Sequence, residues 1–252
     1  MKRIFLIFIA GLLISTSLFA QKRKTSTINW LSIAIKGGYG GSLLMNQNIF
    51  SDKKVTPNFM NGSYFFGGRI GWTLGDYIGV SFETDFSTFG QEFDVFDGSV
   101  NFNKITKISS MDLIPMLRFT ATTGFYAELG PKFSTLKSIT ETPTLDAALF
   151  PGGLTNVYNE KYTSAILGIG FYYLFVERIT LSLGFRANYG WKSMVSNSSY
   201  YSVTDDGRYF PDTPYTNSTV NLIQLQGVLE LNYFFGFFGD ASCGKGRLML
   251  FK

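Results

Sequence analysis

The 252-residue chain contains no histidine. Histidine is the base of Ser-His-Asp and Cys-His catalytic sets and a common metal ligand, so its absence excludes these kinds of site. Carboxylate-pair catalysis remains open, because Glu83 and Asp85 are two residues apart and would share one face of a strand. Two carboxylates beside Lys and Arg are more often ion-pair partners. We therefore expect a protein that is not an enzyme, with no catalytic residue, metal or cofactor.

Cysteine and long apolar runs are also scarce. The single Cys243 cannot form an internal disulfide. The apolar run from Ile4 to Phe19 follows Met1-Lys2-Arg3 and precedes Ala20, which is typical of a cleavable signal peptide over residues 1–20. No other stretch reaches the roughly 18 uninterrupted apolar residues of a membrane-spanning helix. The sequence therefore predicts export and excludes a helical membrane protein.

Charged residues make up only 16% of the chain, and the net charge is +4. Part of this excess comes from Lys22, Arg23 and Lys24, in a short stub over residues 21–29 that precedes the first strand pattern. A short basic stub does not indicate nucleic-acid binding, and we expect no nucleic-acid partner.

Apolar and polar residues alternate with period two after residue 30, in runs of about nine to eleven residues or more, the length that a tilted strand needs to cross a bilayer. The clearest run is Ile179 to Lys192, in which every odd-numbered residue is apolar or aromatic. Seven further runs begin near Leu31, Ser63, Tyr77, Ser109, Phe125, Ser164 and Ile223. The pattern predicts eight strands and no core helix.

The connections between these runs are of two kinds. Leu74-Gly75-Asp76, Thr122-Thr123-Gly124 and Val176-Glu177-Arg178 predict tight turns. Long polar connections cover residues 46–61, 92–106, 138–161 and 194–218. Short turns at one end and long loops at the other are typical of outer-membrane barrels. We predict an all-β fold, a closed antiparallel eight-stranded transmembrane β-barrel over residues 30–238. Its turns and both termini would be periplasmic, its loops extracellular, and residues 239–252 a C-terminal tail.

The polar face of the strands is rich in glycine, where a water-exposed face would carry Lys and Glu, so we assign it to a narrow lumen. The same face carries basic and acidic residues in nearly equal number: Lys36, Arg69, Glu83, Asp85, Asp112, Arg118, Glu128, Lys132, Arg186, Lys192 and Glu230. These charges either pair as a plug or line a path for ions or substrate. An eight-stranded lumen is just wide enough for side chains to fill, which favours the plug.

The apolar face carries aromatic residues near the strand ends, as in the girdles that outer-membrane barrels place at the two lipid interfaces: Trp30, Tyr39, Trp72, Phe119, Tyr173, Tyr189, Trp191 and Tyr233. We therefore expect outer-membrane lipid to be a partner of this face.

The connection 194–218 combines aromatic residues with an arginine in a polar segment: Tyr200, Tyr201, Arg208, Tyr209, Phe210 and Tyr215. This composition suits protein recognition, and the segment is the candidate partner loop. The alternative is a loop that only shields the barrel mouth.

The signal ending Ser17-Leu18-Phe19-Ala20-Gln21, the strand that follows almost at once, the spacing of Gly67, Gly71 and Gly79, and the terminal Tyr233-Phe234-Phe235 resemble the PorT-like outer-membrane β-barrel family. The resemblance covers nearly all of the mature chain. It rests on the overall pattern of these features and not on a short sequence signature. It implies a small porin-like barrel of a Gram-negative outer membrane. One member of that family is required by a machine that secretes proteins across this membrane.

Three functions follow from these expectations. The first is a non-enzymatic barrel that acts through protein partners, as an accessory or scaffold of an outer-membrane secretion or assembly complex. The second is a narrow porin-like channel or a binder of small solutes, which requires the charged row to line open water. The third, an enzyme that uses Glu83, has the least support because no catalytic set is recognisable.

Overall fold

The structure is a computed structural model that describes residues 27–45, 55–58, 61–74, 77–96, 101–142, 158–176, 178–195 and 219–238. The chain divides into a unit of residues Asn29–Phe235 and a unit of Met1–Ile28 with Gly236–Lys252. The predicted signal peptide (1–20), most of the stub, the tail (239–252) and all six residues of the candidate partner loop lie outside the described residues. No helix among the described residues is long and apolar enough to cross a membrane.

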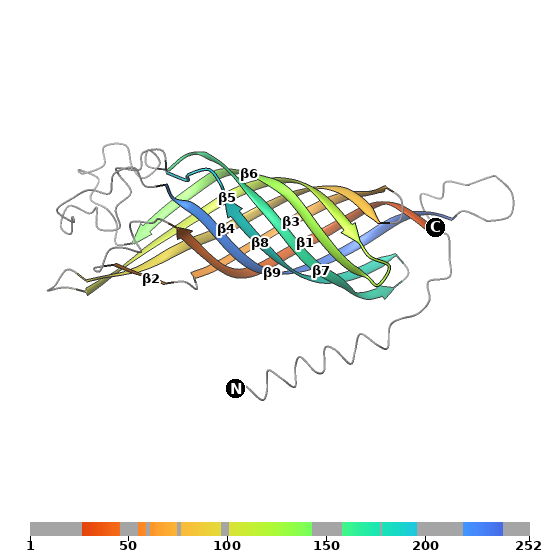
Figure 1. Cartoon of the computed structure of the whole chain (residues 1–252), viewed down its shortest axis with the longest axis horizontal. Coiled ribbons are helices and arrows are strands. Elements are labelled where there is room, and N and C mark those ends of the chain that lie inside the picture. The colour runs from red at the N-terminus through yellow and green to blue at the C-terminus, as the bar shows by residue number, and fades with distance from the viewer. Residues whose placement is uncertain are drawn as a thin grey trace, which may run out of the picture. The chain divides into compact units, whose positions relative to one another are not determined.

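The described residues form nine β-strands: β1 (Thr27–Met45), β2 (Val55–Asn58), β3 (Asn61–Leu74), β4 (Ile78–Phe96), β5 (Asn101–Thr120), β6 (Phe125–Thr142), β7 (Lys161–Val176), β8 (Ile179–Gly190) and β9 (Asn221–Phe238). They pair in the order β2-β4-β3-β1-β9-β8-β7-β6-β5, and β4 also pairs with β5. This last pairing closes the sheet (Figure 1). The predicted closed antiparallel barrel of eight strands is confirmed, with β2 as a short addition beside β4.

Several strands are longer than the sequence predicted. β4 and β5 extend to Phe96 and from Asn101, so most of the predicted loop 92–106 is strand. β6 continues to Thr142 inside the predicted loop 138–161, and β2 lies inside the predicted loop 46–61. The alternation of apolar and polar residues weakens where a strand leaves the membrane, but backbone pairing continues because each N–H and C=O still needs a partner. Polar composition therefore made these predicted loops longer than the structure shows them to be.

A tight turn joins β5 to β6 at the predicted Thr122-Thr123-Gly124. The Gly124 N–H donates to the Ala121 carbonyl (3.0 Å), and the Ala121 N–H donates to the Phe125 carbonyl (2.7 Å). Gly124 has φ of +90°, a conformation that favours glycine. We call this end of the barrel the turn end, since the short β3–β4 and β7–β8 connections lie there too, and the opposite end the loop end.

The ladder between β5 and β6 is interrupted where two prolines face each other. Leu113 pairs with Phe133 and Leu117 with Leu129, and the same register places Pro115 opposite Pro131. Both prolines remain paired on their other sides, with Phe82 of β4 and Ala165 of β7. Because proline has no N–H, the β5–β6 ladder loses the two hydrogen bonds of this residue pair.

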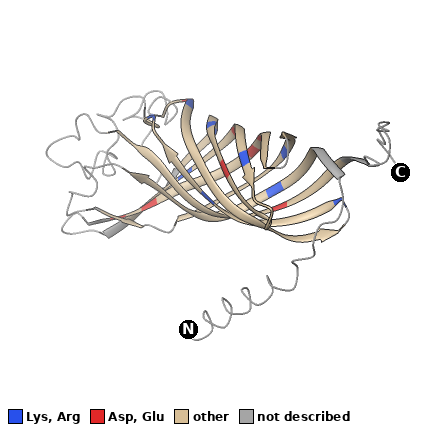
Figure 2. Ribbon diagram, turned by 45° about the vertical axis from the view of Figure 1, so that its right-hand side comes forward, with Lys and Arg blue, Asp and Glu red and all other residues tan. Residues whose placement is uncertain are grey.

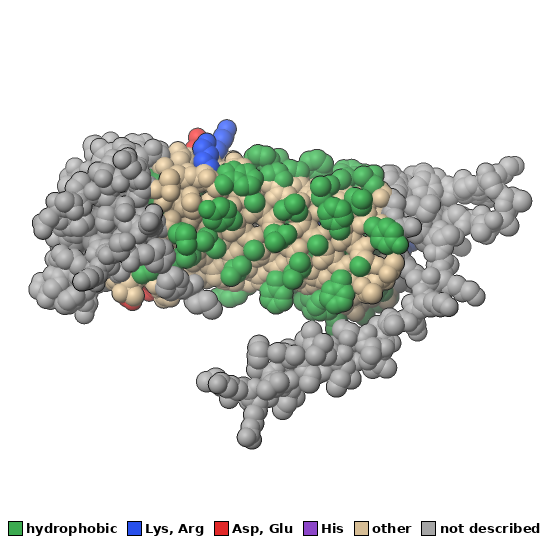
Figure 3. Space-filling model, viewed as in Figure 1, with side chains coloured by type: hydrophobic (Ala, Val, Ile, Leu, Met, Phe, Trp, Pro, Cys, Tyr) green, Lys and Arg blue, Asp and Glu red, His purple; other side chains and the backbone are tan. Residues whose placement is uncertain are grey.

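The outer wall of the barrel is apolar. Burial alternates residue by residue along β3 and β7, and large apolar side chains are exposed on all eight barrel strands, with Phe185 73% and Leu225 65% exposed. Figure 3 shows these side chains as a belt around the visible wall. A soluble protein rarely exposes so much apolar surface, whereas a bilayer solvates it.

Most of the aromatic residues predicted to form the girdles are exposed on this outer wall. Tyr39, Phe119, Tyr173, Tyr189, Trp191 and Tyr233 are exposed, and Trp72 is half-buried. The side chain of Trp30 lies outside the described residues.

Candidate functional site

The lumen collects charged side chains from strands that are far apart in the sequence. Because side chains alternate along a strand, every second residue points inward. Ten of the eleven predicted lumen residues are buried, with exposures of 0–6%. Figure 2 shows basic and acidic bands on the barrel strands. Lys192 is the exception: β8 ends at Gly190, and the Lys192 side chain is exposed beyond it. The prediction of a lumenal Lys192 was wrong, because it extended the alternation past the last paired residue.

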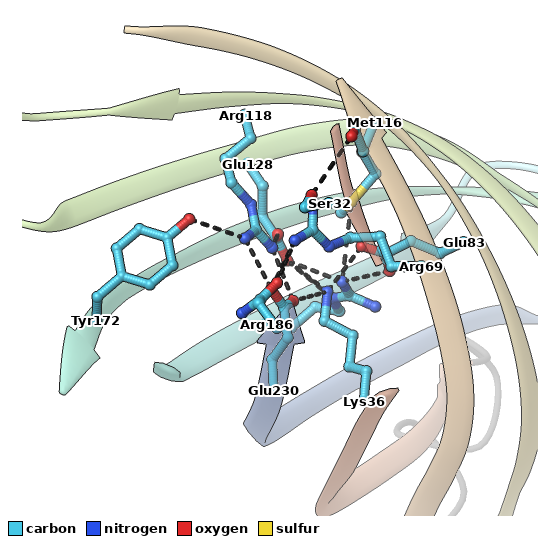
Figure 4. Close-up of polar contacts among 12 residues, drawn as sticks. Ser32, Lys36, Arg69, Glu83, Met116, Arg118, Glu128, Tyr172, Arg186 and Glu230 are labelled. Atoms are coloured by element: carbon cyan, nitrogen blue, oxygen red, sulfur yellow. Dashed lines mark hydrogen bonds and ion pairs between the residues drawn. The ribbon is translucent and has the colours of Figure 1, made fainter. Parts of the chain in front are cut away.

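Glu230 of β9 is one of two acidic residues of the lumen that contact three cations, the other being Glu128. Arg118 donates to both of its carboxylate oxygens, at 2.8 Å each, which is the bidentate geometry that fits guanidinium to carboxylate. Lys36 Nζ lies 3.1 Å from Glu230 Oε2, and Arg69 Nη2 lies 3.1 Å from Oε1. One carboxylate thus contacts three cations from three other strands (Figure 4).

Arg186 of β8 joins the other carboxylates. Its Nη2 donates to Glu83 Oε2 and to Glu128 Oε1, each at 2.8 Å, and its Nη1 lies 3.4 Å from Asp85 Oδ2. Lys36 Nζ also donates to Glu83 Oε1 at 2.7 Å. Glu83 and Asp85 therefore both contact Arg186, which is the ion-pair arrangement and not a pair of carboxylates facing a shared substrate.

Four basic and four acidic residues form this central network: Lys36, Arg69, Arg118, Arg186, Glu83, Asp85, Glu128 and Glu230. A separate pair lies nearer the loop end, where Lys132 Nζ is 2.7 Å from Asp112 Oδ2. Ser87 (2.5 Å) and Ser110 (2.8 Å) also donate to Asp112. The buried charges balance, as burial without water demands.

Strand β7 has a glycine, Gly168, at the level of the central network, where the neighbouring strands have charged residues. Gly168 of β7 is paired with Glu128 on one side and Arg186 on the other. A Cβ atom at Gly168 would lie 2.5 Å from Glu128 Cγ, closer than real contacts allow. Glycine at this position lets the carboxylate and the guanidinium meet across β7, which explains why small residues occur on the lumen face.

An apolar cluster that the sequence patterns did not predict fills the lumen toward the loop end. It consists of Leu44, Phe89, Phe93, Ile108, Tyr158, Tyr162, Met194, Val195, Val220 and Leu222, all 4% exposed or less. Phe89 and Phe93 share the inward face of β4 with Glu83 and Asp85. The available signal lay beyond Thr88, where the inward Phe89 and Phe93 of β4 are aromatic and the outward Glu92 and Asp94 are acidic.

Aromatic residues border the network toward the turn end. Arg118 Cζ lies 4.3 Å from the centre of the Tyr126 ring, and Arg118 Nη1 donates to Tyr172 Oη at 3.3 Å. The centroids of the Tyr126 and Tyr172 rings are 5.4 Å apart. A guanidinium over an aromatic face is held by the ring quadrupole, so these rings help to fix the position of Arg118. The described residues contain no group of three or more side chains suited to hold a metal ion.

No family model and no curated protein matches the chain. Among solved structures it is similar to the outer membrane protein OprG from Pseudomonas aeruginosa, with 10% identity, 86% of this chain and all of that chain covered, and a TM-score of 0.47. It is also similar to outer membrane protein AlkL (12% identity, 90% and 97% covered, TM-score 0.40) and to Neisserial surface protein A (10%, 80% and 96%, 0.39).

The assignment of the chain rests on its own strand pairing and surface. A closed antiparallel barrel with an apolar outer wall and a polar inner wall is the architecture of outer-membrane proteins. The chain is an outer-membrane β-barrel.

Proposed function

We propose that this barrel acts through protein partners, as a non-enzymatic accessory or scaffold of an outer-membrane secretion or assembly complex. The resemblance to the PorT-like family implies such a role. The described residues offer a closed interior and an extensive outer surface, so a function at the surface fits them better than a function inside the lumen.

The filled lumen is the observation that carries this proposal. A channel needs a continuous path of water, whereas the central network and the apolar cluster occupy successive levels of this barrel. Removing one member of a buried ion pair typically costs about 3–5 kcal/mol, because the other charge is left unpaired. Opening a path through the network would separate several such pairs, which disfavours conduction.

The first test measures conduction. The purified barrel is inserted into planar bilayers beside a variant with Phe89→Ala and Arg186→Ala, which opens both the apolar cluster and the network. We expect no steady conductance from the unchanged protein and measurable conductance from the variant, which shows that insertion succeeded. Steady, ion-selective conductance of the unchanged protein would favour the channel alternative and contradict the proposal.

The second test looks for the partner. A photo-crosslinking residue is placed at Tyr209 in the predicted partner loop, and a matched one at Phe185, which is 73% exposed on the apolar wall. Crosslinked adducts from the native membrane are identified by mass spectrometry. We expect a stoichiometric protein adduct from Tyr209 and lipid from Phe185. A protein adduct only from Phe185 would move the contact to the wall, and no protein adduct from either site would contradict a stable partnership.

A further inference from the structure

Three neighbouring strands share one order of side chains as they leave the apolar wall toward the loop end. On each strand an outward apolar residue is followed by an outward hydroxyl residue and then by an exposed lysine. The triplets are Met111, Ser109 and Lys107 on β5, Phe133, Thr135 and Lys137 on β6, and Ala165, Thr163 and Lys161 on β7. The repetition on three strands makes a row of lysines parallel to the edge of the belt.

The strand register places these lysines close together. Lys161 pairs with Thr135, two residues from Lys137, and such diagonal neighbours on one face are about 7–8 Å apart. Lys107 pairs with Thr140, three residues from Lys137 on the same strand. Next to β7, the exposed Lys192 follows the exposed Trp191. The row of Lys107, Lys137 and Lys161 thus extends over three adjacent strands, and the exposed Lys192 follows the end of the next strand, β8.

A β-bulge helps to direct Lys137 outward. The β5–β6 register shifts so that Ser110 pairs with Leu136 and Ser109 with Ser138, which leaves Lys137 without a residue opposite it. As a result Leu136 and Ile139 both pack against the interior cluster, while Lys137 and Ser138 are exposed. Bulges often re-aim a side chain in this way.

The lysine row lacks ion-pair partners within the part of the chain that the structure describes. One exposed carboxylate, Glu160, precedes Lys161. The wall is asymmetric, because β4 carries the outward Glu92 and Asp94 at the same end. Figure 3 shows basic side chains just beyond the edge of the apolar belt. Lys107 pairs with Gly90, two residues from Glu92, so Glu92 is a diagonal neighbour of Lys107. The row is therefore a net positive surface at the boundary of the membrane, and its β5 end adjoins a carboxylate.

We infer that this row binds the phosphate groups of lipid head groups. Moving out from the centre of a bilayer, hydrocarbon is followed by the ester layer and then by phosphate, and the apolar, hydroxyl and lysine residues follow the same order. The lysine lies four residues beyond the apolar one, about 13 Å along the strand and about 10 Å along the membrane normal at a tilt near 40°. The head-group layer is about 5–8 Å thick, and lysine side chains extend readily into it.

A membrane lipid fits this depth better than a soluble polyanion or an acidic protein, because the lysines adjoin the belt itself. The test titrates bis-phosphorylated lipid A into the purified full-length protein in zwitterionic detergent and counts bound lipid by native mass spectrometry. Dephosphorylated lipid A is the lipid control. The variant replaces Lys107, Lys137, Lys161 and Lys192 by Gln, and Lys161→Gln is measured alone.

Net charge needs its own control. A second variant replaces Lys22, Lys24, Lys245 and Lys252 by Gln, which removes the same charge at positions outside the described residues. Circular dichroism verifies that every variant is folded. Each basic residue near an anionic membrane surface strengthens binding by about fivefold. We expect about a fivefold loss of affinity for Lys161→Gln, a loss of about six-hundredfold for the four together, and little change in the control.

Affinity for phosphorylated lipid A should also fall as salt rises. Equal affinity of the fourfold variant and the unchanged protein would overturn the inference, as would equal binding of dephosphorylated lipid A or an equal loss in the charge control. Full displacement of the lipid by soluble polyphosphate at equal phosphate concentration would assign the row to a soluble polyanion instead.

Discussion

Three cations converge on the carboxylate of Glu230, so the loss of its charge should destabilise the barrel strongly. Glu230→Gln keeps the shape of the side chain and removes its charge, which leaves Arg118, Lys36 and Arg69 facing a neutral amide. The side chain of Glu230 is fully buried, so water cannot replace the lost partner. We expect the free energy of unfolding to fall by about 3–5 kcal/mol, the usual cost of breaking a buried ion pair from one side.

A double variant separates charge imbalance from lost shape. Lys36→Met also removes one cation, so Glu230→Gln with Lys36→Met restores equal numbers of buried charges. The two sites are in direct contact, with Lys36 Nζ 3.1 Å from Glu230 Oε2, and we expect the double variant to be about 1–3 kcal/mol more stable than the sum of the single changes predicts.

The assay is urea unfolding of the barrel in lipid vesicles, followed by tryptophan fluorescence. Asn221→Gln, at a half-buried polar position near the start of β9, is the matched control and should leave the unfolding midpoint unchanged. A loss below about 1 kcal/mol for Glu230→Gln, or strict additivity with Lys36→Met, would show that the lumen charges are solvated independently and would refute the picture of a paired plug.

Three further changes test other parts of the barrel by the same unfolding assay. Gly168→Ala should destabilise by about 1–3 kcal/mol, because the new Cβ atom collides with Glu128, whereas a Cβ at Gly62 meets only ordinary contacts. Replacing both Pro115 and Pro131 by Val should stabilise by about 1 kcal/mol for each restored ladder hydrogen bond, and no gain would mean that the two strands cannot close there. Phe89→Ala should cost about 3–5 kcal/mol, since the ring is fully buried in the apolar cluster, and a negligible cost would mean that this cluster is loosely packed.

The sequence alone was sufficient for the architecture. The period of two follows from strand geometry, and the short turns follow from local chemistry such as glycine at Gly124. Alternation also assigned ten charged residues to the lumen, because the inward direction depends only on the parity of the position within a strand.

Parity failed where regular pairing stops. Lys192 lies past the end of β8, and the bulge at Lys137 changes the parity of every later residue in β6. The apolar cluster lies toward the loop end of the lumen, near the level at which the strands leave the membrane. Phe89 reads as lipid-facing from composition, but its parity in β4 turns it inward. The aromatic ring of Phe89 suits the lipid face, whereas its position along β4 places it on the lumen face. The strand register of the structure shows that the position along the strand determines its direction.

The sequence by itself determined the number and direction of the strands and the balance of lumen charges, because these depend on residue type and spacing. Only the tertiary structure decided that Arg118 binds Glu230 in a bidentate pair, that Arg186 joins Glu83 to Glu128, and that lysines of three strands form one row. These contacts join residues up to 112 positions apart. They depend on the shear of the closed barrel, which sets the height at which each strand meets its neighbour.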